Sequence, residues 1–554
     1  MTKLKTAAST ALRWSWFILL VMFAFGYLAA GLSNPIQRAG DVPELTPQSD
    51  ETIDSALAAL DERWQQSLDE KGLESAAAAD WLTVCRRMSL ALVGNGLSLE
   101  EIRQLEQYPE ADRETIHLSQ LLSDPRYHYY WAERWSRYLV GTDGGQFVLY
   151  RRRRFRVWLS EVFASNRPYD QMVRDLITAE GLWTDKPEVN FLTATFDSND
   201  GSADPIRLAA RTSRAFLGLR IDCLQCHNDF LGNVNLGDVD EPREGLQTDF
   251  HQLAAFYTSA KTNGLQGIRN GEVDYDYKYL DATEETSVEA AVPYSPELLP
   301  ADGDPRDRLA TWVTHPENRQ AARSAVSHVW ALMFGKPIGE AVDNLPLDSE
   351  CDPMLEFLAD DFVQHDFDMQ RLIRLIAGSS AFRVDSRADF EVTYKHENAH
   401  AVFPLVRLRP EQVAGSVIQA ARIKKTDRES SLFLQLITAT GVGDFVKQYG
   451  DVGEDEFSAD SITITQRLLM MNGSMLKDLV NFNPVLNTSG HVQMFAKENS
   501  HAVDTVYLCA LNRYPTATEK QHFVGRLDES EDRTKAIEDL VWVLLNSSEL
   551  AWNH

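Results

Sequence analysis

Cysteine is scarce in this chain, with five residues among 554. Such a small number excludes a fold built on a disulfide scaffold, in which cysteines are dense. Positive charge is also in short supply, because 54 Lys and Arg residues stand against 82 Asp and Glu residues, for a net charge of −28. A surface this acidic repels phosphate backbones, so we expect no nucleic-acid partner.

The chain also lacks the composition of a disordered, collagen-like or multi-span membrane protein. Its hydrophobic fraction of 44% and charged fraction of 25% are ordinary for a globular protein. At 554 residues it is too long for one compact core, so we expect two or three domains. No Walker, Rossmann or GxSxG pattern and no fixed-period repeat occurs. Two local features carry chemical information: a hydrophobic N-terminal run and one CxxCH pentapeptide.

The hydrophobic run extends from Trp14 to Leu32 without a charged residue. As a helix it would be about 28 Å long, close to the thickness of a bilayer's hydrocarbon core. Lys3, Lys5 and Arg13 precede it, and the positive-inside rule keeps that end in the cytoplasm. We therefore predict a signal anchor over residues 1–32 that binds the membrane in a single pass.

A cleaved signal peptide is the alternative, since Ala29, Ala30 and Gly31 offer small residues to a peptidase. The run is longer than a usual signal-peptide core, which favours the anchor. Both interpretations place the body in the periplasm or at the cell surface. Residues 33–50 are rich in Pro and polar residues and are predicted to be a linker.

The body of the chain is predicted to be mainly α, with two helical modules and long irregular loops. Apolar residues recur at three- and four-residue spacing over 51–261 and again over 304–554, whereas few runs alternate with period two. Ser98 and Glu101 form a capping-box pattern that predicts a helix start. Residues 262–303 are rich in acids, Gly and Pro, and we expect an interdomain segment there with a small β-hairpin.

The pentapeptide Cys223-Leu224-Gln225-Cys226-His227 is the strongest chemical signal. In c-type haem attachment, two thiols add to the haem vinyl groups and the adjacent imidazole reaches the iron from the same side. The predicted cofactor is therefore haem c, with Cys223 and Cys226 as covalent anchors and His227 as the proximal iron ligand. Attachment takes place outside the cytoplasm, which agrees with the predicted topology.

Other interpretations of the two cysteines stay open from the sequence. Zinc needs four ligands, and the remaining cysteines, Cys85, Cys351 and Cys509, are isolated along the chain. A redox disulfide between Cys223 and Cys226 lacks the surrounding thioredoxin-like pattern. A merely structural pair is the third interpretation.

A sixth iron ligand is not fixed by the sequence. His251 lies on the next predicted helix and is a candidate distal ligand, and Met172 is a weaker one. Without a sixth ligand, a five-coordinate iron could bind small molecules or peroxide.

The residues around the motif resemble a known family. The stretches SDPRYHYYWAERWSRYLVG, RFRVWLSEVFASNRPYDQMVRDLITAEG and TSRAFLGLRIDCLQCHNDF have the order and spacing of the planctomycete-type cytochrome-associated domain, domain of unknown function 1549. The second half, from RDRLATWVTHPENRQAARSAVSHVWALMFGKPIGEAVDNL through LCALNRYPTATE, is similar to its habitual partner, domain of unknown function 1553. The resemblance covers about residues 75–260 and 304–530.

The resemblance implies an exported, mostly helical, two-module protein associated with c-type cytochrome chemistry. In the family, Asp-His-Lys-Phe-Asp-Pro usually follows the CxxCH, whereas this chain continues with Asn228 and Asp229 and lacks the second histidine. Only Cys223, Cys226 and His227 match the motif, so only these three roles carry over.

Three functions are consistent with the sequence. The first is a membrane-anchored c-type haem protein that transfers electrons to or from redox partner proteins. The second is an extracytoplasmic enzyme that acts on a polysaccharide or a peroxide through haem or another metal. For that enzyme, Glu340, Asp360 and Asp361 are the acids within the family-like blocks, although paired acids on helices are usually surface residues. The third is a surface interaction protein in which the CxxCH only braces a loop.

Overall fold

The computed structural model describes most of the chain beyond the N-terminal region. It covers residues 51–142, 150–196, 202–237, 241–263, 266–271, 274–347, 351–425 and 487–554, with residues 446, 449, 457, 466, 468, 470 and 471. The predicted anchor at 1–32 and the linker at 33–50 lie outside these residues. Across the described ranges, no helix combines the length and the apolar character that crossing a bilayer would need.

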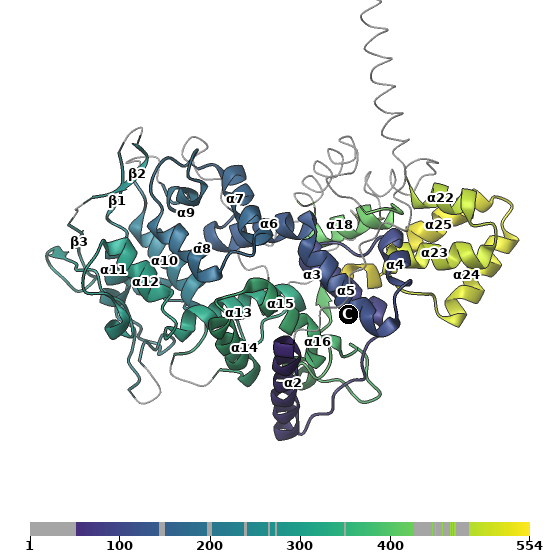
Figure 1. The fold of residues 1–554 in the computed structure, drawn as a ribbon, viewed down its shortest axis with the longest axis horizontal. Coiled ribbons are helices and arrows are strands. Elements are labelled where there is room, and N and C mark those ends of the chain that lie inside the picture. The colour runs from purple at the N-terminus through teal and green to yellow at the C-terminus, as the bar shows by residue number, and fades with distance from the viewer. Residues whose placement is uncertain are drawn as a thin grey trace, which may run out of the picture.

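The described chain is mainly helical, as predicted, and its strands occur only in two-stranded sheets (Figure 1). The helices of the first half are α2 (Glu51–Lys71), α3 (Trp81–Val93), α4 (Leu99–Leu105), α5 (Glu110–Ser123), α6 (Pro125–Val140), α7 (Arg152–Ala164), α8 (Tyr169–Thr178), α9 (Asn190–Thr193), α10 (Pro205–Leu217) and α11 (Gln247–Ala255). Short 3₁₀ turns are η1 (Pro187–Val189) and η2 (Asp222–Gln225).

The second half is also built mainly from helices. Its described helices are α12 (Pro305–Val313), α13 (Arg319–Phe334), α14 (Pro353–Gln364), α15 (Met369–Gly378), α16 (Ser380–Arg383), α17 (Tyr394–Asn398), α18 (Pro410–Ala420), α22 (Thr488–Phe495), α23 (Asn499–Leu511), α24 (Ala517–Glu529) and α25 (Arg533–Leu545). Short 3₁₀ turns are η4 (Pro296–Leu298) and η5 (Glu549–Ala551).

The described part of the chain also contains three antiparallel strand pairs. They are β1 (Ala260–Thr262) with β2 (Ile268–Asn270), β3 (Asp276–Tyr277) with β4 (Thr286–Ser287), and β5 (Val406–Arg407) with β6 (Trp552–Asn553). Two of these pairs lie in or beside the 262–303 segment, so the predicted β-structure there is confirmed.

Local sequence signals set the helix ends. Ser98 and Glu101 form the predicted capping box at the start of α4, with the Ser98 hydroxyl accepting from the Glu101 amide at 3.2 Å. The Asp204 carboxylate caps α10, and Pro205 occupies the first turn of this helix. Gly218 ends α10 at a φ of 61°, where a Cβ would lie 2.9 Å from a Leu345 methyl group.

The largest hydrophobic core is continuous across the predicted interdomain segment. It extends from Leu60 to Phe403 and buries four tryptophans fully, Trp131, Trp135, Trp312 and Trp330. Within it α12 packs on α8, and α13 packs on α10 and α3. The first predicted module and residues 309–403 of the second therefore share one core. Residues 262–303 separate them along the sequence, but packing does not separate them there.

A second core comprises Leu90 and described residues between Leu408 and Leu550, mostly on helices α18 and α22–α25. A small third cluster joins α3, α4 and α5 to Leu508 and Cys509 of α23. The change of core thus falls near residues 403–408. Figure 1 shows α22–α25 at one end of the molecule and α10, α11 and β3 at the other.

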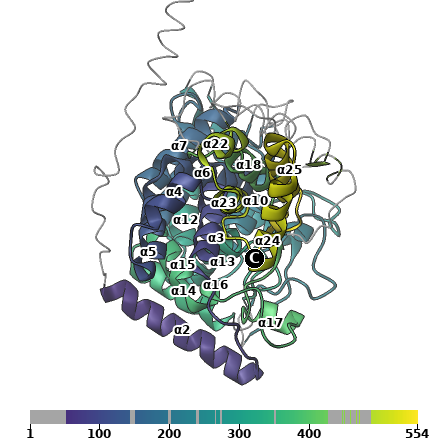
Figure 2. The ribbon, with the colours of Figure 1, turned by 90° about the vertical axis from the view of Figure 1, so that its right-hand side faces the viewer.

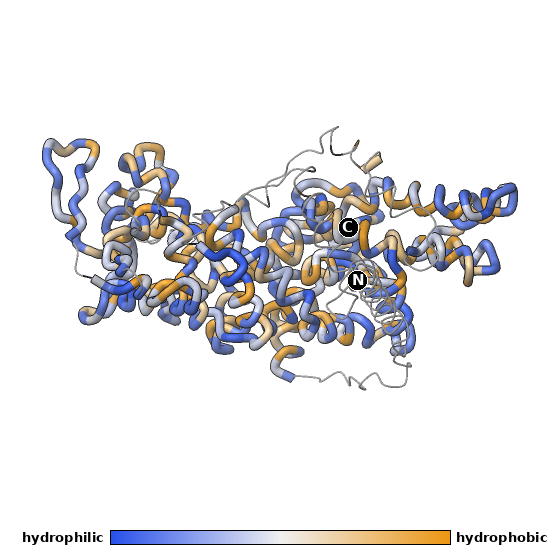
Figure 3. Tube along the Cα trace, turned by 90° about the horizontal axis from the view of Figure 1, so that it is seen from above, coloured by the Kyte–Doolittle hydropathy of each residue, from blue (hydrophilic) through white to orange (hydrophobic). Residues whose placement is uncertain are grey.

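The outer helices are amphipathic, with apolar residues on the inner face and polar residues on the outer face. Figure 2 shows α2 lying along one edge, where it packs on α14 and α15. Its inner face buries Leu60, Trp64 and Leu68, while acidic residues occupy the outer face. In Figure 3 hydrophobic and hydrophilic residues alternate along the helices in the same way.

Candidate functional site

The CxxCH forms a short turn soon after the end of α10. Residues 222–225 make the 3₁₀ turn η2, and the Cys226 amide donates to the Cys223 carbonyl oxygen at 3.2 Å. Leu224 is fully buried, which turns its neighbours outward. As a result Cys223, Cys226 and His227 are all exposed. The structure therefore presents the three predicted attachment residues together on one surface turn.

The turn is held from its inner side through the backbone of Gln225. Its carbonyl oxygen accepts from His251 Nε2 at 3.1 Å, from Gln247 Nε2 at 3.1 Å and from the Tyr277 hydroxyl at 3.3 Å. Gln247 and His251 are four residues apart and lie on one face of α11. Both are buried, so the three donors form a fixed support under the motif.

His251, the candidate distal ligand, has both of its ring nitrogens in hydrogen bonds within the structure. The Gln225 carbonyl can only accept, so His251 Nε2 carries the proton and Nδ1 accepts from the Tyr275 hydroxyl at 2.8 Å. Both ring nitrogens are thus engaged, and Tyr277 stacks on the ring at 3.5 Å between centroids. Burial lowers the pKa of His251. Iron ligation by His251 would require one of these bonds to break.

His227 is oriented by its own backbone. Its Nδ1 lies 2.7 Å from the Asn228 carbonyl oxygen, which again can only accept. Nδ1 therefore carries the proton, and the lone pair of Nε2 is left to face outward. A hydrogen bond of this kind fixes the tautomer and the ring orientation of a metal-ligating imidazole. Phe230 stacks beside the ring at 5.9 Å.

The thiols have the character of unpaired cysteines. The structure contains neither a disulfide between Cys223 and Cys226 nor one involving Cys85, Cys351 or Cys509. Partial burial, and then the Asp229 carboxylate, raise the pKa of Cys223. Catalytic redox cysteines have a lowered pKa instead.

The zinc interpretation finds no support in the part of the chain that is described. There, no group of three or more His, Cys, Asp or Glu side chains is placed to hold a metal ion. Covalent haem attachment needs only two accessible thiols and one imidazole with a nitrogen free to bind the iron. Cys223, Cys226 and His227 fit that requirement.

A loop after the motif is fixed by Asp229. This buried carboxylate accepts from the amides of Leu231 at 3.1 Å and Val234 at 2.6 Å. The Asn228 side chain accepts from the Gln247 amide at 2.8 Å. The loop therefore has a defined shape even though Phe230 and Leu231 project into solvent.

Residues of the second module also hold the site. The buried Asp343 carboxylate pairs with Arg214 Nε and Arg220 Nε, each at 2.8 Å. The Leu345 amide donates to the Gly218 carbonyl oxygen at 2.7 Å. These contacts fix the end of α10 and the short segment that leads into the CxxCH. Sequence reasoning missed Asp343 and Leu345, because nothing local to them points to residues over 120 positions away.

The other residues that the sequence offered as candidate ligands or catalytic acids lie in the core, in ion pairs or at the surface. Met172 is buried in the main core. Asp361 is buried and pairs with Arg371, and Asp360 pairs with Arg319 at the surface. Glu340 is exposed.

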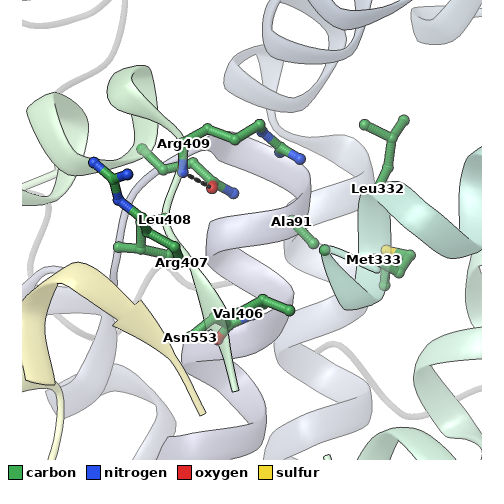
Figure 4. Close-up of a pocket in the computed structure, with 10 residues that line it drawn as sticks. Ala91, Leu332, Met333, Val406, Arg407, Leu408, Arg409 and Asn553 are labelled. Atoms are coloured by element: carbon green, nitrogen blue, oxygen red, sulfur yellow. Dashed lines mark hydrogen bonds between the residues drawn. The ribbon is translucent and has the colours of Figure 1, made fainter. Parts of the chain in front are cut away.

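A small cavity lies elsewhere, at the junction of the two cores (Figure 4). Its volume is about 30 Å³, room for one or two water molecules. The residues that line it come from α3, α13, α18, β5 and β6 and the chain beside them, and they include Arg407, Arg409, Gln412 and Asn553. None of the CxxCH residues is among them.

The support under Gln225 can be tested by His251→Leu. This change removes one of three donors to the Gln225 carbonyl, so amides of residues 222–228 should exchange with solvent about fivefold faster, the effect of ~1 kcal/mol. Hydrogen-exchange mass spectrometry would measure this. Thr248→Ala, an exposed position on α11, is the matched control and should leave the exchange unchanged. If residues 222–228 exchanged at the same rate in both variants, His251 would not support the turn.

Comparisons with known proteins give a consistent assignment. The model of one family, described as protein of unknown function DUF1549, matches residues 59–261. The model of a second family, described as protein of unknown function DUF1553, matches residues 305–438. No curated protein and no solved structure matches the chain. The order of the two matches confirms the resemblance seen in the sequence, although the second match ends at residue 438 and not near 530. The chain thus carries a DUF1549 region followed by a DUF1553 region.

Proposed function

We propose that this chain is a membrane-anchored extracytoplasmic protein that carries haem c on the CxxCH turn and transfers electrons. The observation that carries the proposal is the joint presentation of Cys223, Cys226 and His227 on one surface turn. The turn keeps its shape through Gln247, His251 and Tyr277, without a disulfide. This favours an attachment site over a pair of cysteines that merely braces a loop.

Each residue has a defined part in this proposal. The Cys223 and Cys226 thiols would hold the haem through thioether bonds to its vinyl groups, and His227 Nε2 would bind the iron. When bound, haem c supplies reversible one-electron chemistry at the iron. The protein holds the His227 imidazole through the Asn228 carbonyl, which sets its orientation and its strength as a ligand.

The cellular location is part of the proposal and rests on the sequence. The uncharged run from Trp14 to Leu32 follows Lys3, Lys5 and Arg13, which orients the body outside the cytoplasm. Protease added to spheroplasts should digest the body. A body that remains protected would contradict this orientation.

The haem proposal is tested by expressing the full chain with an active cytochrome c maturation system. The wild type should show a Soret band, stain for haem after denaturation, and gain the mass of one haem. Cys226→Ala should retain at most a singly attached haem, and the double change Cys223→Ala/Cys226→Ala should retain none. His227→Ala should keep covalent haem but shift its spectrum, because the iron loses a strong nitrogen ligand.

Cys351→Ala is the matched control, since this half-buried thiol lies outside the motif. It should behave as the wild type. A wild type without Soret absorbance, with the mass of the bare polypeptide and a plain disulfide, would contradict the proposal.

A further inference from the structure

Three strongly exposed apolar side chains lie around the CxxCH turn. Leu231 is 83% exposed, Phe230 73% and Leu280 65%. They are among the five most exposed large hydrophobic residues of the described chain, with Tyr394 and Phe495. Single exposed apolar residues need no explanation, but three in segments around one turn do.

Hydrogen bonds bring together the two segments that carry these three side chains. The Leu280 amide donates to the Gln247 side chain at 3.1 Å, and the Gln247 amide donates to the Asn228 side chain at 2.8 Å. Asn228 leads directly into Phe230 and Leu231. Since Phe230 also stacks on His227, this apolar face begins beside the proposed iron ligand.

The same face is bordered by a strongly acidic segment. The β3–β4 hairpin and its flanks expose six carboxylates, Asp274, Asp276, Asp281, Glu284, Glu285 and Glu289, against one ammonium, Lys278. Among the described residues, none of the six pairs with a Lys or Arg side chain. Tyr277 of β3 donates to the Gln225 carbonyl, which fixes the hairpin beside the CxxCH turn.

We propose that this apolar face with its acidic border docks a small basic electron-transfer protein whose own redox centre is ringed by lysines. The inference rests on the proposed function, because it places the partner's redox centre beside His227. Unpaired carboxylates attract a basic partner over distance and orient it. Leu231, Phe230 and Leu280 then provide an apolar centre within a polar rim, as in a transient interface.

The probe is a small lysine-rich c-type cytochrome, mixed with the full chain at low ionic strength. Association should be fast and should slow steeply with added salt. Glu284→Lys/Glu285→Lys should slow association about tenfold at low salt, because it reverses two charges of the border. The matched control is Glu529→Lys/Glu531→Lys, two exposed acids at the α24–α25 connection, which should change the rate less than about twofold.

A second variant tests the apolar side chains at the centre of the proposed docking face. Leu231→Ser should make the complex dissociate about fivefold faster, with association little changed. Leu405→Ser, at an exposed leucine of the second half, should leave dissociation as in the wild type. Far-ultraviolet circular dichroism checks that each variant is folded.

The outcomes separate this inference from the haem proposal. Equal association rates for the wild type, the Glu284/Glu285 variant and its control would overturn the docking face, whether or not haem is attached. A chain without haem that still shows salt-sensitive binding, weakened by the same variants, would support the docking face and overturn the haem site.

Discussion

Replacing Arg306 with methionine should lower the free energy of unfolding by about 3 kcal/mol. Arg306 is fully buried and donates to the carbonyl oxygens of Ile177 at 3.0 Å and Ala179 at 2.8 Å. It also holds the Asn270 side chain, at 2.5 and 2.9 Å. Methionine fills similar space but leaves three acceptors without their donor, and buried acceptors without partners are costly.

Because Arg306 connects the two family regions, the loss of stability in Arg306→Met tests whether these regions depend on each other. Arg306 belongs to the DUF1553 region, whereas Ile177 and Ala179 belong to the DUF1549 region. The midpoint of urea unfolding, followed by tryptophan fluorescence, gives the measurement. Arg319→Met is the matched control, because this arginine is 47% exposed and its surface ion pairs contribute about 0–1 kcal/mol. Equal shifts for both variants would show that the two regions do not depend on Arg306.

Much of the local structure follows from short-range signals in the sequence. The Ser98–Glu101 capping box and the Pro205 start of α10 both depend on residues within one helical turn. The CxxCH turn is local for the same reason, since its two thiols and its imidazole lie within five residues. These features were predictable because the partners are close in sequence.

The packing between the two regions was not predictable in this way. Arg306 reaches acceptors 127 and 129 residues away, and Arg214 meets Asp343 across 129 residues. Segment 262–303 has the composition of a linker, yet β1 and β2 connect it to the buried Arg306 through Asn270. Composition alone cannot distinguish a linker from a segment that packs against its neighbours.

The role of His251 illustrates the same limit within the site. Its place on the helix after the CxxCH made it a candidate iron ligand, but the structure pairs its two nitrogens with Gln225 and Tyr275. One signal was available: Gln247 and His251 are four residues apart, which indicates two polar side chains on one buried helix face.

The contacts of Asp343 and Leu345 suggest why the two regions occur in series. Both residues belong to the DUF1553 region and hold the end of α10, five residues before Cys223. The Gly218 carbonyl at that end would otherwise be one of the unpaired groups that a helix terminus leaves. The DUF1553 region thus supports the segment that leads into the CxxCH of the DUF1549 region.

Lowering the pH from 7 to 5 should destabilise the folded chain strongly, because three buried histidines are held neutral. Burial lowers the pKa of His117 to about 4 and the pKa values of His328 and His400 to about 3. Arg134 and Arg409 add to the effect at His328, and Lys336 and Lys71 add to it at His400. In the unfolded chain each imidazole has a pKa near 6.5.

The sign follows from proton binding. Below a pH of about 6.5 the unfolded chain binds protons that the folded chain refuses, so stability falls as the pH falls towards 3–4 and then levels off. Each histidine should cost about 2 kcal/mol between pH 7 and pH 5. Glu101 and Glu519, whose pKa values are lowered to about 2, lose their stabilising effect only below pH 4.5, outside this interval.

The His328→Phe variant isolates the contribution of one histidine to this loss of folding stability. The His328 ring stacks on Tyr138 at 3.7 Å, and neither of its nitrogens has a hydrogen-bond partner among the described residues, so phenylalanine keeps the aromatic contact and binds no proton. Urea unfolding at pH 7 and pH 5 should show a fall about 2 kcal/mol smaller than in the wild type, with equal or higher stability at pH 7. The exposed His501→Phe variant should keep the wild-type fall. An undiminished fall in His328→Phe would mean that His328 takes up its proton in the folded chain as readily as in the unfolded one.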